Sequence, residues 1–206
     1  MSLTKPEHDT SLQPHNPLVL EQTCNRANGK RAETLSGRNR LETKIYEAHT
    51  LSLLRACFDA GTILKIALSI TGLRGWAARN AMSHRHLKLV FEYESLPPAF
   101  HGFRILHLTD LHINCHPGLA DHIHNQIKDV PVDLCMLTGD YLFRVACGEH
   151  EAHAYMEHVI TGVNARGGCI GILGNHDLAS SATFLESLGV RMLINESVEV
   201  KVGDES

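Results

Sequence analysis

The sequence predicts an α/β fold built around a largely parallel sheet. Three short apolar runs have the length and composition of buried strands: 103–109, 134–138 and 169–173. Segments with apolar residues at helical spacing alternate with them: 119–127, 152–163 and 179–188. Strands that alternate with helices form βαβ units, so a parallel sheet covered by helices is expected. One further strand is expected at 198–202.

Length and composition limit the alternatives. With 206 residues, of which 43% are hydrophobic and 20% are charged, the chain can form one good-sized core or a modest domain with an appendage. A collagen-like period, sustained heptads and a cysteine-dense framework are all absent from the sequence, which excludes those classes. The six Cys form no C-x-x-C pair, which favours a reducing compartment. A cytoplasmic location is therefore expected.

Charge divides the sequence into two unlike halves. Residues 1–100 hold 13 Lys/Arg against 9 Asp/Glu, whereas residues 101–206 hold 6 against 14. Ten of the 15 His also lie in the second half. Carboxylate and imidazole groups together are the composition from which divalent-metal sites are built.

The first hundred residues are expected to form two regions outside the main domain. Residues 1–44 are polar and basic with almost no periodic apolar pattern, which is typical of a disordered tail. No aromatic residues are interleaved with its basic residues, so no nucleic-acid partner is expected. Residues 45–100 are expected to be a helical extension that ends with a short strand at 87–93. Residues 101–206 are expected to form the main domain.

The segment 51–73 is the best candidate for membrane contact. Arg55, Asp59 and Lys65 interrupt its apolar residues, so it falls short of the roughly 20 apolar residues of a spanning helix. An amphipathic helix is expected instead. Such a helix either packs on the domain or, with the basic residues that follow it, attaches to the inner membrane surface as a peripheral anchor.

Polar residues with metal-binding capacity follow each of the three predicted strands. Asp110 and His112 follow the first, Asp140 follows the second, and Gly174-Asn175-His176-Asp177 follows the third. Ligands of open α/β sheets bind outside the carboxyl ends of the strands, so these side chains should converge. Their oxygen and nitrogen atoms suit Mg²⁺, Mn²⁺, Fe²⁺ or Zn²⁺.

Local geometry supports a shared site. An extended backbone over Asp110-x-His112 would place both side chains on one face, where one metal ion can bind both. Gly139 allows the chain to turn sharply before Asp140. A carboxylate at Asp140 is placed to bridge two metal ions about 3.5–4 Å apart, which is the spacing used in phosphoester hydrolysis. Asp177 is also a candidate N-cap for the helix that begins near Ala179.

The four-residue motif is more specific than its parts. With 16 Gly, 10 Asn, 15 His and 9 Asp in the chain, G-N-H-D is expected by chance about 0.0025 times. TDLH, TGD and GNHD, in this order and spacing, resemble the calcineurin-like metallophosphoesterases. The flanking FRILHLTDLHIN and LINESVEV are similar to a bacterial branch of membrane-associated phosphodiesterases, some of which cleave the pyrophosphate of UDP-2,3-diacylglucosamine. The resemblance covers about residues 100–202.

The resemblance implies a function and a set of roles. Asp110, His112 and Asp140 would hold one divalent ion, and Asp140 and Asn175 a second, with Mn²⁺ favoured. His176 would contact the substrate phosphate, either stabilising its charge or protonating the leaving oxygen, and Asp177 would orient His176. The implied substrate is a small-molecule or lipid-linked phosphoester. The implied fold is the two-sheet αββα sandwich, of which this chain would supply the N-terminal half.

The resemblance also has a limit. The family pattern continues with further His ligands, whereas residues 178–206 contain no His. A truncated member is therefore expected, whose missing half is either supplied by another chain or absent. Two hypotheses follow: a dinuclear metal-dependent phosphoester hydrolase, or a non-catalytic remnant that acts at a membrane surface or as an interaction protein.

Overall fold

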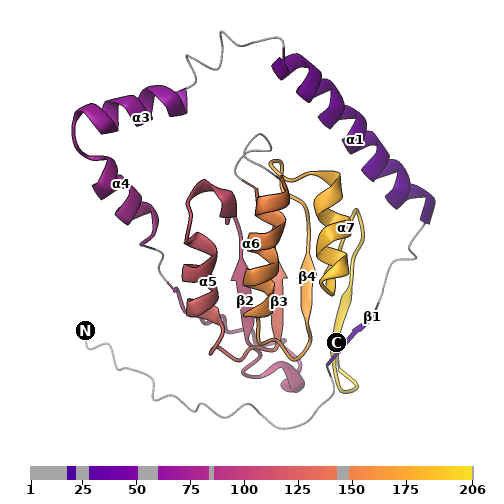
Figure 1. Ribbon diagram of the computed structural model, residues 1–206. Coiled ribbons are helices and arrows are strands. Elements are labelled where there is room, and N and C mark those ends of the chain that lie inside the picture. The colour runs from indigo at the N-terminus through magenta and orange to yellow at the C-terminus, as the bar shows by residue number, and fades with distance from the viewer. Residues whose placement is uncertain (1–17, 22–27, 51–59, 84–85, 143–148, 206) are drawn as a thin grey trace, which may run out of the picture.

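A four-stranded parallel sheet lies at the centre of the computed structural model, which describes residues 18–21, 28–50, 60–83, 86–142 and 149–205 (Figure 1). The strands, in their spatial order, are β2 (Ile105–Leu108), β3 (Leu134–Leu137), β4 (Cys169–Gly171) and β5 (Val190–Met192). Every neighbouring pair is parallel. The predicted α/β class and its parallel sheet are confirmed.

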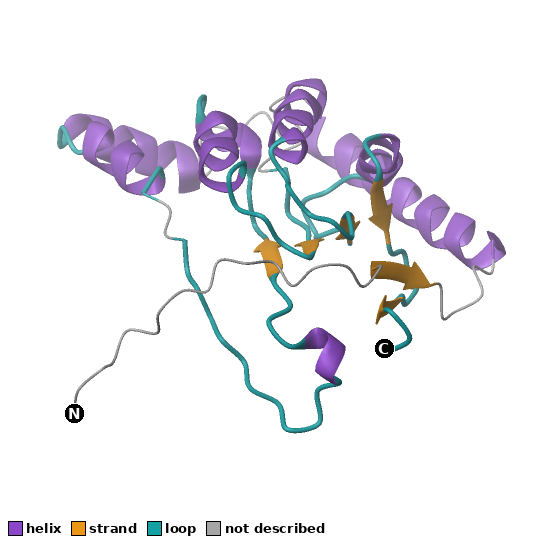
Figure 2. Ribbon diagram, turned by 90° about the horizontal axis from the view of Figure 1, so that it is seen from below, coloured by secondary structure: helices purple, strands orange, loops and turns teal. Residues whose placement is uncertain are grey.

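Helices cover one face of this sheet (Figure 2). They are α5 (Leu119–Ile127), α6 (Glu149–Thr161) and α7 (Ala179–Ser187). Their buried apolar side chains pack on the strands in one core: Leu119, Ala120, Ile123, Ile127, Ala152, Met156, Val159, Ala182 and Leu185. The helical spacing in the sequence therefore predicted the covered face correctly.

The other face of the sheet is more open. Alternation along β2 places Leu106 in the core and Ile105 on the opposite face, where it is 52% exposed. Ile172, directly after β4, is 42% exposed. The helices thus shield only the face to which Leu106 contributes.

The strand β5 is absent from the sequence-based prediction. It has three residues, Val190–Met192, and follows Gly189 at the end of α7. So short a run carries no periodic signal of its own. Its position beside β4 becomes clear only from the pairing of Cys169 with Val190.

Residues 1–44, expected to be disordered, contain regular structure. The strand β1 (Leu18–Glu21) pairs antiparallel with β6 (Glu199–Val202), which confirms the strand expected near the end of the sequence. The helix α1 (Asn28–Thr50) follows. The helix has no apolar stripe that a sequence pattern would reveal, but Leu35 packs against the core and two of its arginines bind the main domain. The remainder of the tail lies outside the described residues.

The described part of the expected extension contains two helices and lacks the predicted strand. It contains α3 (Ala60–Ile70) and α4 (Arg74–Ala81). Residues 87–93 have no strand pairing, and their apolar side chains are exposed. Apolar alternation does not by itself make a strand, which also needs a partner strand, and among the described residues 87–93 have none. The division into 1–44, 45–100 and 101–206 stays a prediction.

Part of the segment 51–73 lies outside the described residues, which begin again at Ala60. Within the described ranges, no helix combines the length and hydropathy of a bilayer-spanning segment.

Met156 on α6 provides a test of the helix-covered core. Its side chain is 2% exposed, so Met156→Ala should lower the free energy of unfolding by about 3 kcal/mol. Urea denaturation should show a lower midpoint with an unchanged slope. The neighbouring Glu157 is exposed, and Glu157→Ala should change stability by less than about 0.5 kcal/mol. Equal midpoints for the two variants would contradict this packing.

Candidate metal centre

The predicted site residues lie in three loops at the carboxyl edge of the parallel sheet. Asp110 and His112 follow β2, and Asp140 follows β3. Asn175, His176 and Asp177 lie between β4 and α7. The topology therefore brings together segments that are 28 or more residues apart in the sequence, as the strand order predicts.

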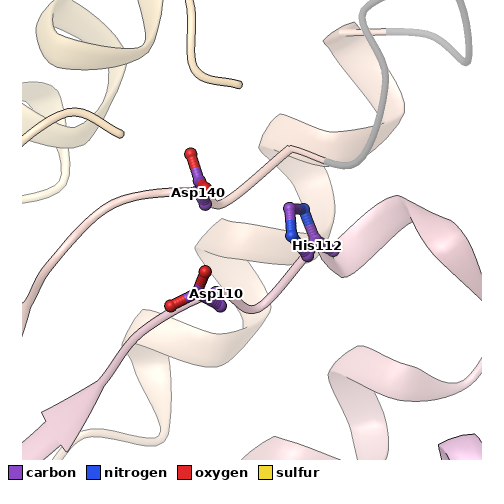
Figure 3. A group of neighbouring side chains, drawn as sticks. All are labelled: Asp110, His112 and Asp140. Carbon is purple, nitrogen blue, oxygen red and sulfur yellow. The ribbon is translucent and has the colours of Figure 1, made fainter. Parts of the chain in front are cut away.

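Asp110, His112 and Asp140 converge. Each offers one ligand atom, and these atoms all lie within 4.8 Å of one another (Figure 3). Among the described residues, this is the one group of His, Cys, Asp and Glu side chains with that geometry. Asp110 is exposed, whereas His112 and Asp140 are half-buried, so the group opens to solvent on one side.

All three residues have a left-handed backbone. Their φ angles are 52° for Asp110, 42° for His112 and 54° for Asp140. The extended conformation expected over Asp110-x-His112 is therefore wrong, although the two side chains do converge. Residues other than glycine adopt this region at an energetic cost, and such residues cluster at functional sites.

Backbone hydrogen bonds hold the loop after β2 against the loop after β3. The amide of Asp110 donates to the carbonyl of Gly139 at 3.1 Å, and that of His112 donates to the carbonyl of Asp140 at 3.0 Å. The amide of Ile113 donates to the carbonyl of Tyr141 at 2.8 Å. These bonds continue the pairing of β2 and β3 beyond the ends of the strands. They hold Asp110, His112 and Asp140 in the left-handed conformation.

A hydrogen bond fixes the tautomer of His112. Its Nδ1 lies 2.8 Å from the carbonyl oxygen of Leu142. A carbonyl only accepts, so Nδ1 carries a proton, and in the neutral ring Nε2 then carries the lone pair. Metal-binding histidines have this arrangement, in which the second ring nitrogen is held by a carbonyl or carboxylate.

Two glycines allow the loops after β3 and β4 to touch. A Cβ atom on Gly139, which has φ 91°, would lie 2.3 Å from the amide nitrogen of Gly174. A Cβ atom on Gly174 would lie 2.1 Å from Oδ1 of Asp140. The glycines of TGD and GNHD are therefore required by this close approach, which presses Asp140 against the loop that contains His176.

Asp177 is a buried brace between the same two loops. Its carboxylate accepts hydrogen bonds from the amides of Asp140 at 2.8 Å, Tyr141 at 2.7 Å and Leu142 at 3.2 Å. It also accepts one from the amide of Gly174 at 2.8 Å. Burial of the side chain, which is 2% exposed, raises the pKa of Asp177, while the four backbone donors act in the opposite direction.

Asp177 is not the N-cap of the following helix. The N-cap of α7 is Leu178, whose own side chain forms no capping hydrogen bond. The N-cap expectation is wrong because all four bonds described for the Asp177 carboxylate lead to amides in or before the loop between β4 and α7.

His176 approaches the site from the third loop. Its amide donates to Oδ1 of Asp140 at 2.9 Å, and its ring meets that of His112 edge to face with centroids 5.0 Å apart. Asn175 is exposed, between Gly174 and His176 in the same loop. The loop thus joins the site, while the individual roles of Asn175, His176 and Asp177 stay predictions.

Two contributors had little signal in the sequence. Leu142 acts through its backbone, whose carbonyl accepts from His112 and whose amide donates to Asp177, and any residue other than proline would offer the same atoms. Tyr141 is 1% exposed, and its one hydroxyl proton is shared between the carbonyls of Ile172 at 2.6 Å and Leu137 at 3.1 Å, which links the ends of β3 and β4. Its position directly after Asp140 was the one available hint.

The donor set fits a divalent metal ion. Two carboxylates supply hard oxygen ligands, and an imidazole with its Nε2 lone pair supplies a borderline nitrogen ligand. The hydrogen bonds to Leu142 and from His176 provide the outer support that metal ligands commonly have.

Comparison with known proteins agrees with this arrangement. Residues 103–201 match the family model of calcineurin-like phosphoesterases. The UDP-2,3-diacylglucosamine pyrophosphatase LpxG of Chlamydia muridarum is 28% identical over 128 residues, which are 60% of this chain and 38% of the relative. LpxG of Chlamydia trachomatis is 28% identical over 110 residues, which are 51% of this chain and 32% of that relative. No solved structure matches significantly.

The chain therefore spans less than two fifths of the length of these relatives. The family match covers all three loops of the site and every strand of the parallel sheet. This family uses divalent metal ions, in accord with the group formed by Asp110, His112 and Asp140. The segment 103–201, which carries the sheet and the site, belongs to the calcineurin-like phosphoesterase family.

Proposed function

We propose that the carboxyl edge of the sheet forms a dinuclear metal centre that hydrolyses a phosphoester. The observation that carries the proposal is the convergence of ligand atoms from Asp110, His112 and Asp140 within 4.8 Å. The family match of the segment 103–201 supports hydrolysis as the reaction of this site, since the family is described as phosphoesterases.

The ligand roles follow the placement of the loops. Asp110, His112 and Asp140 would hold one ion, and Asp140 and Asn175 would hold the second. Asp140 suits a bridging role because the loops after β2 and β4 both contact it, through the amides of His112 and His176 respectively. Mn²⁺ is favoured by the mixed carboxylate, imidazole and amide donors, with Mg²⁺, Fe²⁺ and Zn²⁺ as alternatives.

The remaining residues bind and orient the substrate. When bound, divalent ions in such a centre supply an activated water and positive charge opposite the reacting phosphate. His176, beside His112, would contact a phosphate oxygen and either stabilise its charge or protonate the leaving oxygen. Asp177 would keep His176 in position through the amides of the two loops.

The relatives suggest the substrate class. Both are UDP-2,3-diacylglucosamine pyrophosphatases by name, so we propose that the substrate is a pyrophosphate or phosphodiester linked to a lipid. A lipid-linked substrate would present its phosphates near a membrane surface.

The helices α3 and α4 favour contact with such a surface. Their exposed apolar side chains form what we term the α3–α4 surface: Ile63, Leu64, Ile66, Ile70, Leu73 and Trp76. Residues 60–91 contain five Lys/Arg and no Asp or Glu. Apolar side chains beside uncompensated positive charge match an anionic lipid bilayer, and we propose peripheral attachment there.

Gly174→Ala tests the metal centre without changing a ligand. The added Cβ would meet Asp140 at 2.1 Å, so Asp140 must shift and affinity for Mn²⁺ should fall about 10-fold or more. Isothermal titration calorimetry measures this change. Gly37→Ala is the matched control because nothing lies within 4 Å of its added Cβ. Equal Mn²⁺ affinity in the two variants would show that Asp140 is not a ligand in this position.

Asp140→Asn tests the hydrolase. With Mn²⁺ and the chromogenic diester bis(p-nitrophenyl) phosphate, turnover should fall about 100-fold or more relative to the unmodified chain, because the bridging charge is lost. Asp129 is exposed on another part of the surface, and Asp129→Asn should retain full turnover. If the unmodified chain turned over the diester no faster than Asp140→Asn, the alternative of a non-catalytic remnant would be supported.

Vesicle co-sedimentation tests membrane attachment. The chain should bind vesicles that contain phosphatidylglycerol at low salt, and binding should weaken as salt screens the positive charges. Ile66→Asp together with Ile70→Asp should abolish binding, because two charges would have to enter the apolar layer. Failure of the unmodified chain to sediment with anionic vesicles at low salt would end this proposal.

A further inference from the structure

We propose that Arg38 and Glu42 on α1 form a clamp that positions the loop Gly174–Asp177. Both residues lie outside the segment 103–201 that matches the family. Arg38 would be a positioning residue for the site, and its effect on catalysis rests on the proposed hydrolase function. The clamp itself rests only on contacts within the chain.

Arg38 holds the two ends of the loop. Its Nη2 donates to the carbonyl oxygen of Gly174 at 2.5 Å and to that of Asp177. Asn175 and His176 are the two residues between these carbonyls. One guanidinium thus fixes the span of backbone from which both side chains project, with charge-assisted bonds that are stronger than those of neutral donors.

Glu42 completes the clamp. Nε of Arg38 donates to Oε1 of Glu42 at 3.1 Å, one helical turn away. Glu42 also accepts from the amide of Ala179, the first residue of α7, at 3.1 and 3.4 Å. The side chains of Arg38 and Glu42 are 28% and 17% exposed, so solvent screens this pair less than a surface pair.

A second contact fixes α1 along its own axis. Arg31, two turns before Arg38, donates to the carbonyl of Met192 at 3.0 Å and pairs with Glu186 and with Glu196. Two arginines on one side of the helix therefore bind two separated parts of the main domain. This arrangement prevents α1 from sliding, so the guanidinium of Arg38 stays opposite the loop.

The clamp and Asp177 hold the loop from different sides. The Asp177 carboxylate accepts from backbone amides, including that of Gly174. Arg38 instead donates to the carbonyls of Gly174 and Asp177. Loss of Arg38 would leave the amide bonds intact but release the carbonyl side. The loop should then open more often without unfolding of the sheet, which is a local event that hydrogen exchange detects.

Hydrogen exchange of the metal-free, full-length chain tests the clamp directly. Peptides within 172–180 should exchange about 10-fold faster in Arg38→Gln, while peptides from β2 and β3 should keep their rates. Arg40→Gln is the matched control, since Arg40 is exposed on the same helix. Arg38→Lys should restore part of the protection because a lysine retains the charge but not the fork.

Unchanged exchange of 172–180 in Arg38→Gln would overturn the clamp. So would faster exchange throughout the sheet, which would show a general loss of stability rather than a local one. Should Arg38→Gln fail to fold, Glu42→Gln provides the second variant, because it removes the charge of the partner but keeps an acceptor for Ala179. Its loop should exchange faster than that of the unmodified chain, and an unchanged rate would also overturn the clamp.

Kinetics separate the clamp from the proposed function. If the chain hydrolyses the diester, Arg38→Gln should lower kcat about 10-fold, with KM changed less than about twofold, because the displaced loop orients the reacting groups. An unchanged kcat despite faster loop exchange would overturn the positioning role. If even the unmodified chain shows no turnover, the proposed function falls, while the exchange result still decides whether the clamp exists.

Discussion

The buried carboxylate of Asp177 is the interaction on which the arrangement of the site depends. A carboxylate that is 2% exposed must have hydrogen-bond donors, because burial without them is costly. Its four donors belong to the loop after β3 and the loop after β4. These loops cannot separate without leaving the charge unpaired, so Asp140 and His176 are held at a fixed relation. The position of the metal centre is therefore a consequence of a group that need not touch a metal.

Steric contact and backbone strain act in the same direction. Gly139 and Gly174 lie so close that neither tolerates a Cβ, and Asp110, His112 and Asp140 all adopt left-handed backbone. Such conformations persist only where the surroundings over-determine them. Here the surroundings are the backbone bonds between the loops after β2 and β3. The stable sheet thus holds Asp110, His112 and Asp140 in a backbone conformation that is unfavourable by itself.

The sequence predicted which strand ends carry the site but not the local backbone geometry there. Apolar runs and helical spacing predicted the parallel sheet and its covering helices, and the strand ends predicted the convergence of Asp110, His112 and Asp140. The left-handed turn at Asp110 and His112 was mistaken for extended backbone, because it is imposed by hydrogen bonds to residues 139–141 and not by local propensity. The three-residue β5 and the role of Tyr141 likewise depend on partners that are distant in the sequence.

The helix α1 shows why composition misjudged the tail. A disorder prediction weighs apolar burial, and among the described side chains of α1 Leu35 alone packs against the core. Its contacts are instead those of Arg31 and Arg38 with carbonyls and carboxylates of the acidic second half. The opposite charges of the two halves are thus satisfied in part within the chain. A basic segment next to an acidic, metal-binding domain can become ordered through ion pairs and hydrogen bonds. In this chain these contacts place α1 against the loop that carries Asn175 and His176.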